Sequence, residues 1–310
     1  MNAPIPAHYL ADSAVATYAI SAHPDHSRLL HLSLNADALA AFLNDVRDVD
    51  VQNLEYVPFM RFHLARALVS HMGSDFADTL VAIVKDRQHG GFTLGLEGIT
   101  QGSDDYVKFG TAIGHILGPG NHDSMSGTYY ARFLVKHTDA SDSYLRQAYR
   151  LFTMHTDGTF VTEATDWLLM MKFAEENAVG GESRFLHLDD WAECAQFASN
   201  PLGSKPLLYK APGSKNVDER VERPVFFHGE FGLSMSFIDQ FVQPANGAEA
   251  AYLHDLSASM EASSGTQTVS LPVGDLVVLN NYFFVHGRAP FEQHEQLHRE
   301  LMRQRGTFAR

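Results

Sequence analysis

Cysteine is almost absent from this sequence, because Cys194 is the only one in 310 residues. No intramolecular disulfide can form, so a reducing compartment fits best. Long apolar stretches are missing too, and none approaches the roughly 20 residues needed to cross a bilayer. Residues 1–15 lack the basic start and the continuous apolar block of a signal peptide. These absences predict a cytoplasmic protein that does not span a membrane.

Positive charge is scarce as well, with 23 Lys and Arg against 37 Asp and Glu and a formal net charge of -14. Such an acidic surface repels nucleic acid and anionic membranes, and we expect neither as a partner. The 45% hydrophobic and 19% charged residues are typical of a globular protein. Because no low-complexity linker or internal repeat interrupts the chain, we predict a single domain over residues 1–310.

The first third of the chain, residues 1–120, is predicted to be mainly helical. Apolar residues recur at helical spacing in residues 37–49, 59–72, 74–87 and 106–117. Ser74 and Asp75 are the expected N-caps of the third of these helices. These helices would pack on the outside of the core that the rest of the chain forms.

From residue 121 to residue 310 the sequence favours β-structure. Short runs rich in aromatic and β-branched residues predict strands at residues 128–136, 166–173, 184–188, 206–210, 224–228, 233–242, 266–271, 275–285 and 299–308. Two predicted helices, residues 189–198 and 248–262, interrupt them. Many short strands separated by Gly, Pro and Asn turns favour a sandwich or a barrel over a parallel α/β sheet.

Histidine is abundant, with 17 in the chain, and six of them begin a His-x-Asp or His-x-Glu pair. Residues i and i+2 of a strand point to the same side, so one pair can offer two ligands to a metal ion. A histidine from another strand would complete the two-histidine, one-carboxylate set that holds iron(II) with positions left open. The pairs are His23/Asp25, His137/Asp139, His155/Asp157, His187/Asp189, His228/Glu230 and His298/Glu300.

Local context favours one pair but leaves the choice open. His155 and Asp157 follow an apolar run and precede Gly158, as expected where a strand inside a barrel enters a turn. His286 is the candidate for the distant histidine, because it ends the aromatic run of residues 282–285. A hydrogen-bonded core histidine is the alternative interpretation of His286.

The last predicted strand is unusually basic. At a period of two residues, Arg299, Arg303 and Arg305 share one face of it. A guanidinium group matches a carboxylate with two parallel hydrogen bonds, so this face could bind a dicarboxylate beside a metal. The alternative is a solvated edge strand whose charges discourage aggregation.

Seven motifs carry a family resemblance: SGTYYARF (126–133), SDSYLRQ (141–147), HTDGT (155–159), LLMMK (168–172), LHLDDW (186–191), FIDQFVQP (237–244) and RELMRQRG (299–306). With them the sequence resembles, over nearly its whole length, the carbon-starvation-induced family of glutarate 2-hydroxylases. That family belongs with clavaminate synthase and taurine dioxygenase among the iron(II)- and 2-oxoglutarate-dependent oxygenases. The resemblance implies an α+β, mainly β fold, with a double-stranded β-helix (jelly-roll) core, helices packed outside and a helical N-terminal third. It also implies a homotetramer.

The resemblance further implies a reaction and its metal site. His155, Asp157 and His286 would bind Fe(II), with 2-oxoglutarate and O2 as co-substrates. Glutarate would be hydroxylated at C2 to 2-hydroxyglutarate, with release of succinate and carbon dioxide. Ser183, in the segment Gly-Gly-Glu-Ser at residues 180–183, would contact 2-oxoglutarate through its hydroxyl group.

Arginines would bind the carboxylate groups of the co-substrate and the substrate. By resemblance, Arg299 and Arg303 match the two arginines that bind 2-oxoglutarate and an anionic substrate. Arg305 competes for either role, and Arg132 and Arg146 are possible additions to the substrate seat. The sequence does not assign these roles individually.

Ser236 departs from the family pattern, which has an arginine just before the Phe-Ile-Asp-Gln block. This difference keeps open a second interpretation, a 2-oxoglutarate oxygenase that acts on another small anionic substrate. Two further interpretations are a non-catalytic, metal-binding barrel that senses a dicarboxylate and a purely structural barrel. Release of succinate separates the oxygenases from both of these.

Overall fold

The computed structural model describes residues 17–96, 98–137, 147–211 and 217–309. Two residues from the sequence-based predictions, Arg146 and Asp139, lie outside the described residues. Most of the SDSYLRQ motif lies outside them as well.

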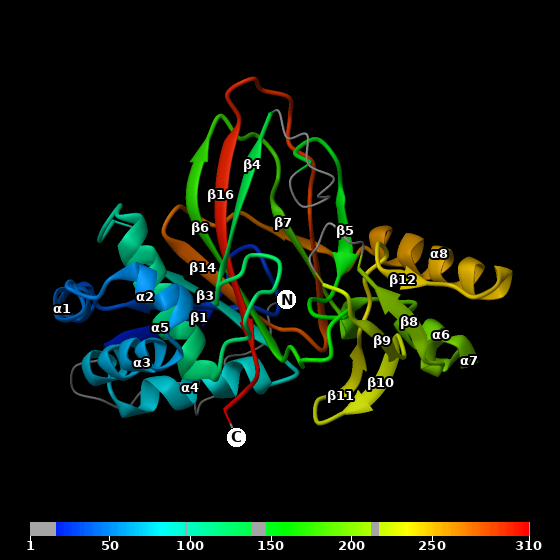
Figure 1. Ribbon diagram of the computed structural model, residues 1–310, viewed down its shortest axis with the longest axis horizontal. Coiled ribbons are helices and arrows are strands. Elements are labelled where there is room, and N and C mark those ends of the chain that lie inside the picture. The colour runs from blue at the N-terminus through cyan, green and yellow to red at the C-terminus, as the bar shows by residue number, and fades with distance from the viewer. Residues whose placement is uncertain (1–16, 97, 138–146, 212–216, 310) are drawn as a thin grey trace.

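The helices fall into two groups along the chain. The first group is α1 (Ala36–Asp45), α2 (Val51–Tyr56), α3 (Pro58–Met72), α4 (Ser74–Lys85) and α5 (Ser103–Leu117). The second is the 3-10 helix η3 (Leu188–Asp190), α6 (Cys194–Ser199), α7 (Pro201–Ser204) and α8 (Gly247–Glu261). Figure 1 shows the two groups on opposite sides of a tall central set of strands.

The four helices expected in the first third are confirmed as α1, α3, α4 and α5. The predicted caps are wrong, because Gly73 is the N-cap of α4 and Asp75 instead accepts a hydrogen bond from the Tyr18 hydroxyl at 2.8 Å. No single helix in the described part of the chain has the length and apolar composition to cross a membrane. Helices α3 and α4 reach that length and composition only when taken together, and the chain bends by 111° between them.

Seven strands form the larger sheet. In order across the sheet they are β1 (Tyr18–Ala22), β2 (Leu30–Leu34), β3 (Gly91–Gly95), β14 (Asp275–Asn280), β6 (Trp167–Glu176), β16 (His298–Gly306) and β4 (Ala131–Lys136). All neighbours are antiparallel except β2 and β3. The first three strands were not predicted, and β3 contains two glycines, which disfavour strands.

The two faces of the larger sheet have different partners. Trp167 and Leu169 on β6 and Met302 on β16 belong to one buried apolar cluster with Phe109 of α5. Because side chains alternate along a strand, the neighbouring residue Met170 faces the opposite way, into the space between the sheets. The helices of the first third therefore cover the outer face, and the inner face is left for a cavity.

Four strands form the smaller sheet. Their order is β13 (Gln267–Val269), β7 (Ser183–His187), β15 (Phe284–Arg288) and β5 (Phe152–His155), all antiparallel. Two further small sheets lie between β7 and β13 in the sequence. One has three strands, β12 (Val242–Gln243), β8 (Leu207–Lys210) and β9 (Arg220–Arg223), and the other is a hairpin of β10 (Phe226–Gly229) and β11 (Gly232–Met235). Two facing antiparallel sheets joined by crossing connections make a jelly-roll, so the predicted fold class is confirmed.

Two predicted strands are wrong as continuous elements. Residues 233–242 contain β11 and, after a gap, β12. Residues 275–285 contain β14, which ends at Asn280, and the start of β15, which belongs to the other sheet. The side-chain oxygen of Asn280 accepts the N–H of Tyr282 at 3.0 Å, so asparagine forms the turn that carries the chain between the sheets.

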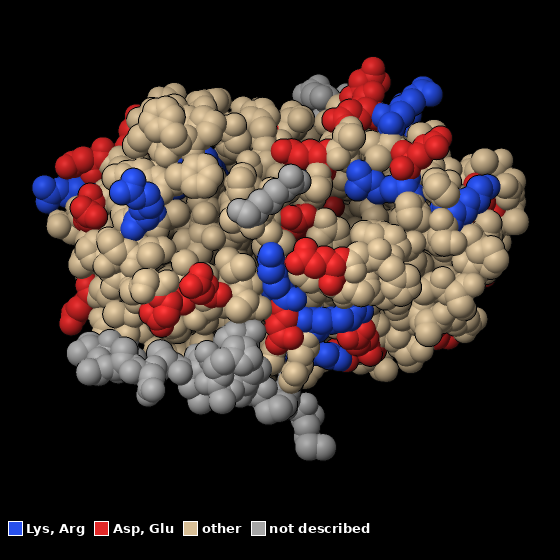
Figure 2. Space-filling model, turned by 90° about the horizontal axis from the view of Figure 1, so that it is seen from below, with Lys and Arg blue, Asp and Glu red and all other residues tan. Residues whose placement is uncertain are grey.

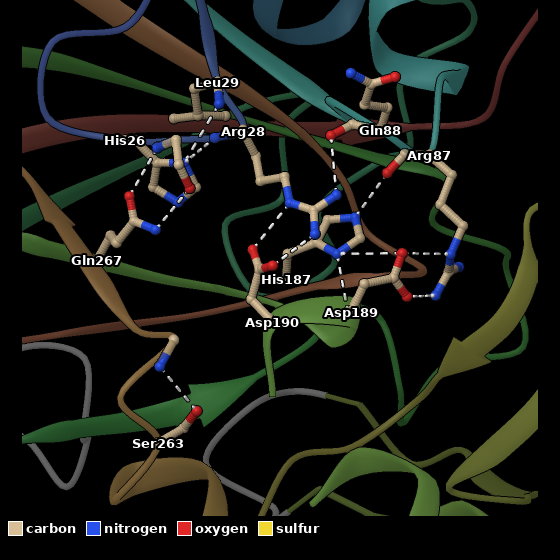
Figure 3. Close-up of polar contacts among 12 residues, drawn as sticks. His26, Arg28, Leu29, Arg87, Gln88, His187, Asp189, Asp190, Ser263 and Gln267 are labelled. Atoms are coloured by element: carbon tan, nitrogen blue, oxygen red, sulfur yellow. Dashed lines mark hydrogen bonds and ion pairs between the residues drawn. The ribbon is translucent and has the colours of Figure 1, made fainter. Parts of the chain in front are cut away.

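Two ion pairs, drawn in Figure 3, define the closed end of the jelly-roll. Arg28, just before β2, donates two hydrogen bonds to Asp190 in η3, at 2.9 and 2.5 Å. Arg87, after α4, donates two to Asp189, at 3.1 and 2.6 Å. Two bidentate pairs thus attach the N-terminal third to the residues that follow β7.

Candidate metal centre and cavity

Three predicted ligands converge on the smaller sheet. His155 ends β5 and His286 lies on β15, and they are direct partners in the antiparallel ladder. Their ring centroids are 4.2 Å apart, and His155 Nε2 lies 3.7 Å from Asp157 Oδ1. One ligand atom from each residue lies within 4.8 Å of the others. Within the described ranges, no other three His, Cys, Asp or Glu residues gather in this way.

A β-bulge shapes this centre. His286 and Arg288 pair with His155 and Phe152, so the register shifts by one residue beside the cluster. A Cβ atom at Gly287 would lie 2.4 Å from the Phe152 carbonyl oxygen, so the close approach of the two strands requires glycine there. Bulges often lie next to active sites, because they redirect a side chain.

Asp157 is held by its turn. Gly158 follows it at φ 73°, and a Cβ atom there would lie 2.2 Å from Thr165 Oγ1. The Asn281 side chain accepts the Asp157 N–H at 2.9 Å and donates to the carbonyl oxygens of Asp157 and Thr165 at 3.0 and 2.9 Å. Asn281 is a positioning residue that the sequence analysis missed, although the asparagines interrupting the apolar run at 276–285 were its signal.

The histidines present the form that binds metal. His155 Nδ1 donates to the Thr153 carbonyl oxygen at 2.8 Å, which leaves Nε2 as the free ring nitrogen facing Asp157. Burial, assisted by the neighbouring His155, lowers the pKa of His286 to about 3, so this imidazole is neutral near pH 7. Two imidazoles and one carboxylate on one side of a site fit Fe(II) and leave its other positions open.

The carboxylate of Asp157 also has a cationic partner. Arg303 Nη1 lies 3.1 Å from Asp157 Oδ2, and Arg303 Nη2 donates to Asp123 Oδ2. Burial by itself raises the pKa of Asp157, but Arg303 and the two histidines outweigh it and hold the pKa below its usual range. Asp157 is therefore ionised, as a metal ligand must be.

The other His-x-Asp and His-x-Glu pairs do not form such a centre in the part of the chain that the structure describes. His187 Nε2 donates to the Arg87 carbonyl oxygen at 2.9 Å and supports the closed end. Glu300 accepts a hydrogen bond from Arg132 at 2.6 Å. Tertiary structure therefore selects one pair where local sequence could not.

A cavity lies beside the three clustered residues. Much of its wall is aromatic and comes from Phe133, Phe152, Phe160 and Phe241. The polar groups in the wall, apart from the cluster itself, are Ser183, Gln240, Arg288, Arg299 and Arg303. An apolar pocket with a few convergent polar groups is typical of a small-molecule site.

The basic strand is internal, so its interpretation as a solvated edge is wrong. β16 pairs with β6 on one side and β4 on the other. Arg299 is 3% exposed, and its Nε lies 3.7 Å from Glu175 Oε1. Burial lowers the pKa of Arg299 to about 10, which still leaves it charged near pH 7. A buried cation in a cavity wall favours an anionic ligand.

Arg288 was missed by the sequence analysis. It is the ladder partner of Ser183, and both line the cavity. Its guanidinium lies 5.3 Å from the centroid of the Phe291 ring, and that of Arg299 lies 5.6 Å from the same centroid. Arg288 follows His286 by two residues on β15, so the strand period was a usable signal.

Two predicted residues, Arg132 and Arg305, and the departing residue Ser236 do not line the cavity. Arg132 is the ladder partner of Met302 on the helix-covered face and pairs with Glu300, so it points away from the cavity. Arg305 is buried near Asp157 but is not among the lining residues. Ser236 lines a separate pocket with Asn281, on the other side of the Asp157 turn. Arg132 and Ser236 therefore do not form part of the cavity wall.

Comparisons with a family model and with known proteins identify the same family. The CsiD family matches residues 18–308. The chain is 46% identical over 285 residues to a glutarate 2-hydroxylase of Citrobacter koseri, covering 91% of this chain and 88% of the relative. It is 43% identical over 295 residues to a glutarate 2-hydroxylase of Klebsiella pneumoniae, covering 94% and 91%.

Solved structures share the fold. The non-heme iron oxygenase OrfP, in complex with Fe, succinate and (3S)-hydroxy-L-Arg, has a TM-score of 0.70 at 17% identity, covering 88% of this chain and 91% of OrfP. Asparagine oxygenase has a TM-score of 0.68 at 14% identity, covering 90% and 93%. These similarities support the jelly-roll architecture.

Proposed function

The chain belongs to the CsiD family, and from that premise we propose that it is an Fe(II)- and 2-oxoglutarate-dependent dioxygenase that hydroxylates glutarate at C2. The products are 2-hydroxyglutarate, succinate and carbon dioxide. The observation that carries the proposal is one cavity that joins a two-histidine, one-carboxylate cluster to buried arginines. The names of the relatives at 43–46% identity support glutarate as the substrate.

His155, Asp157 and His286 hold the iron in this proposal. When bound, the metal would supply the oxygen-activating chemistry. The chain contributes the ligand geometry fixed by the bulge and by Asn281, together with an aromatic wall that excludes water. No side-chain acid or base is required.

Arg299 and Ser183 bind the distal carboxylate of 2-oxoglutarate. A buried arginine and a hydroxyl group in one wall provide a charged anchor and an added hydrogen bond. Arg288 lies next to Ser183 and adds positive charge at the same end. Only the keto acid can chelate the metal, so chelation distinguishes it from glutarate, which has the same number of carbons.

Glutarate needs binding groups of its own in the cavity. Gln240 Nε2 is a buried donor without a hydrogen-bond partner, and Gln240 lines the cavity. Arg303 also lines it, and its Nε has no hydrogen-bond partner. We assign these two groups to a glutarate carboxylate. Arg305 does not line the cavity and adds positive charge near Asp157.

The test is a single-turnover balance. Purified protein is loaded anaerobically with iron(II), and oxygen, 2-oxoglutarate and glutarate are added. Equal amounts of succinate and 2-hydroxyglutarate are expected, and a reaction without glutarate measures uncoupled succinate. Succinate without 2-hydroxyglutarate would reject glutarate but keep the oxygenase, and a panel of dicarboxylates would then find the substrate. No succinate at all would reject both.

The protein acts as a single domain and as a homotetramer in this proposal. β1, β2 and β3 of the first third extend the same sheet as β16, which supports one domain. Tyr56, Phe59 and Phe62 are 58%, 72% and 44% exposed at the corner of α2 and α3, and such an aromatic patch favours a second copy. Sedimentation of wild type and Phe59→Asp tests this assembly.

A small dicarboxylate, rather than a polyanion or a membrane, is the proposed partner. The net charge is -14. On the face in Figure 2, basic side chains lie beside acidic ones and form no continuous basic surface. The single cysteine, Cys194, is buried, which supports a cytoplasmic location.

A further inference from the structure

We propose that Asp123 positions the metal carboxylate by acting through Arg303. The turn that contains Asp123 thereby becomes part of the metal centre. This inference rests on the proposed iron site, because it concerns how that site holds Asp157. Asp123 touches neither metal nor substrate, and its role is positioning.

A continuous chain of contacts supports it. Arg303 donates to Asp123 Oδ2 through Nη2 and lies 3.1 Å from Asp157 Oδ2 through Nη1. The side chains of Arg303, Asp123 and Asp157 are 11%, 4% and 8% exposed. Their interactions are thus weakly screened by water. One guanidinium bridges two carboxylates.

Asp123 is itself rigidly held. Its Oδ1 accepts the N–H groups of Met125 and Ser126, both at 3.1 Å, and its backbone pairs with Thr128. Burial by itself raises the pKa of Asp123, but Arg303 and Arg305 outweigh it and lower the pKa. The residue is therefore a fixed anion, aimed at Arg303 by its own turn.

The bridge divides the two oxygens of Asp157. Oδ1 lies 3.7 Å from His155 Nε2 and faces the ligand cluster, while Oδ2 faces Arg303. A carboxylate fixed in this way offers the metal one oxygen, not two. The position that a second oxygen would fill stays open for a co-substrate.

Charge makes Asp123 necessary for this arrangement. Arg303 and Arg305 are two buried cations near Asp157, and a bound Fe(II) ion adds two more positive charges. Arg303 competes with the metal for the Asp157 carboxylate. The negative charge of Asp123 offsets part of the positive charge of Arg303, which weakens this competition, and the same contact keeps the guanidinium in place. Loss of Asp123 should weaken metal binding, whereas loss of Arg303 should not.

The turn also reaches the cavity. Met125, two residues after Asp123, is part of the cavity wall. One short segment therefore contacts the wall of the cavity and, through Arg303, fixes the metal carboxylate.

The experiment measures Co(II) affinity anaerobically by the visible spectrum, in full-length wild type, D123N, R303Q and the double variant. D123N is expected to weaken Co(II) binding about tenfold or more. R303Q is expected to bind Co(II) as tightly as wild type or more tightly. Its absorption should fall, as expected when Asp157 supplies a second oxygen and coordination rises. If Asp123 acts through Arg303, adding D123N to R303Q changes affinity less than threefold.

The matched control is E300Q. Glu300 lies on β16, like Arg303, and accepts a hydrogen bond from Arg132 of β4 on the face away from the cavity. E300Q should leave Co(II) affinity and spectrum unchanged. Thermal melts of the metal-free forms show which variants fold, and D123S replaces D123N if the latter does not.

Two results would overturn the inference. In one, folded D123N or D123S binds Co(II) like wild type. In the other, D123N weakens binding as much in the R303Q background as in wild type, so that its charge acts directly on the metal. Failure of wild type itself to bind Co(II) and Fe(II) would instead reject the proposed function.

Discussion

Arginines at the two ends of the jelly-roll are used in opposite ways. At the closed end, Arg28 and Arg87 each make a bidentate pair with an aspartate, and their side chains are 21% and 27% exposed. In the cavity, Arg299 is 3% exposed and its nearest carboxylate oxygen is 3.7 Å away. Arginines in bidentate ion pairs hold elements together, whereas a buried arginine without a close carboxylate is available to bind an anion.

Histidines follow the same division. At the closed end, His26 Nδ1 accepts the N–H groups of Arg28 and Leu29, at 3.1 and 3.3 Å, and His187 bonds to backbone. At the metal centre, His155 uses one nitrogen for backbone and leaves the other for the cluster. His26 and His155 thus each engage one ring nitrogen with backbone, and the difference is that the second nitrogen of His155 faces Asp157 whereas that of His26 has no hydrogen-bond partner. The predictions below test this comparison, from the largest expected effect to the smallest.

Removal of a proposed ligand should have the largest effect. His286→Ala is expected to lower Fe(II) affinity by more than about 100-fold, because even residues that only orient ligands cost 10–100-fold. Isothermal titration with anaerobic Fe(II) measures it. His187→Gln, which changes the histidine of a pair at the closed end, is the control and should bind iron normally. An equal loss of Fe(II) affinity in both variants would contradict the division into ligand and structural histidines.

Arg299→Met should lose co-substrate without losing metal. Truncation of a buried charged partner costs about 2–5 kcal/mol, or at least about thirtyfold in 2-oxoglutarate affinity. The visible absorption of the anaerobic complex of iron(II) and 2-oxoglutarate, titrated with 2-oxoglutarate, gives the affinity. Unchanged 2-oxoglutarate affinity would remove Arg299 from the site.

Arg28→Met should act on stability alone. Loss of its two hydrogen bonds to Asp190 is expected to lower the free energy of unfolding by about 2 kcal/mol, since bonds to charged groups contribute about 1.5–3 kcal/mol. Urea unfolding of the metal-free protein measures this. Affinity for Fe(II) and 2-oxoglutarate should stay within twofold of wild type, and a large change would show that the ends are coupled.

Acid should weaken the closed end through His26. Burial lowers the pKa of His26 from 6.5 to about 3, so the folded state favours the neutral ring. Stability is then fully present above about pH 6.5 and is lost as the pH falls toward 3, by about 1–2 kcal/mol at pH 5. His26→Asn retains an acceptor and should flatten this dependence in metal-free protein. Parallel curves for both proteins would contradict it.

Arg132→Ala should have the smallest effect. Its side chain is 43% exposed and pairs with Glu300 outside the cavity, and such pairs contribute less than about 1 kcal/mol. The KM for glutarate and for 2-oxoglutarate should equal that of wild type. A KM raised tenfold would return Arg132 to the substrate site.

The sequence by itself determined α1, α3, α4 and α5 in the first third, because their apolar spacing is set by the helix period and needs no partner. It also contained the family motifs, the basic strand and His286 after an aromatic run. The strands β1 to β3 escaped it, since a strand of five residues is specified largely by the neighbours with which it pairs.

Only the tertiary structure decided which residues share the cavity. A period of two residues tells that Arg299 and Arg303 lie on one face, but not that this face is inside and that of Arg132 outside. Likewise, six pairs met the spacing of a metal half-site, and only the ladder between β5 and β15 brings His155 to His286. Spacing along a chain fixes relative direction, whereas inside and outside are fixed by what packs against the sheet.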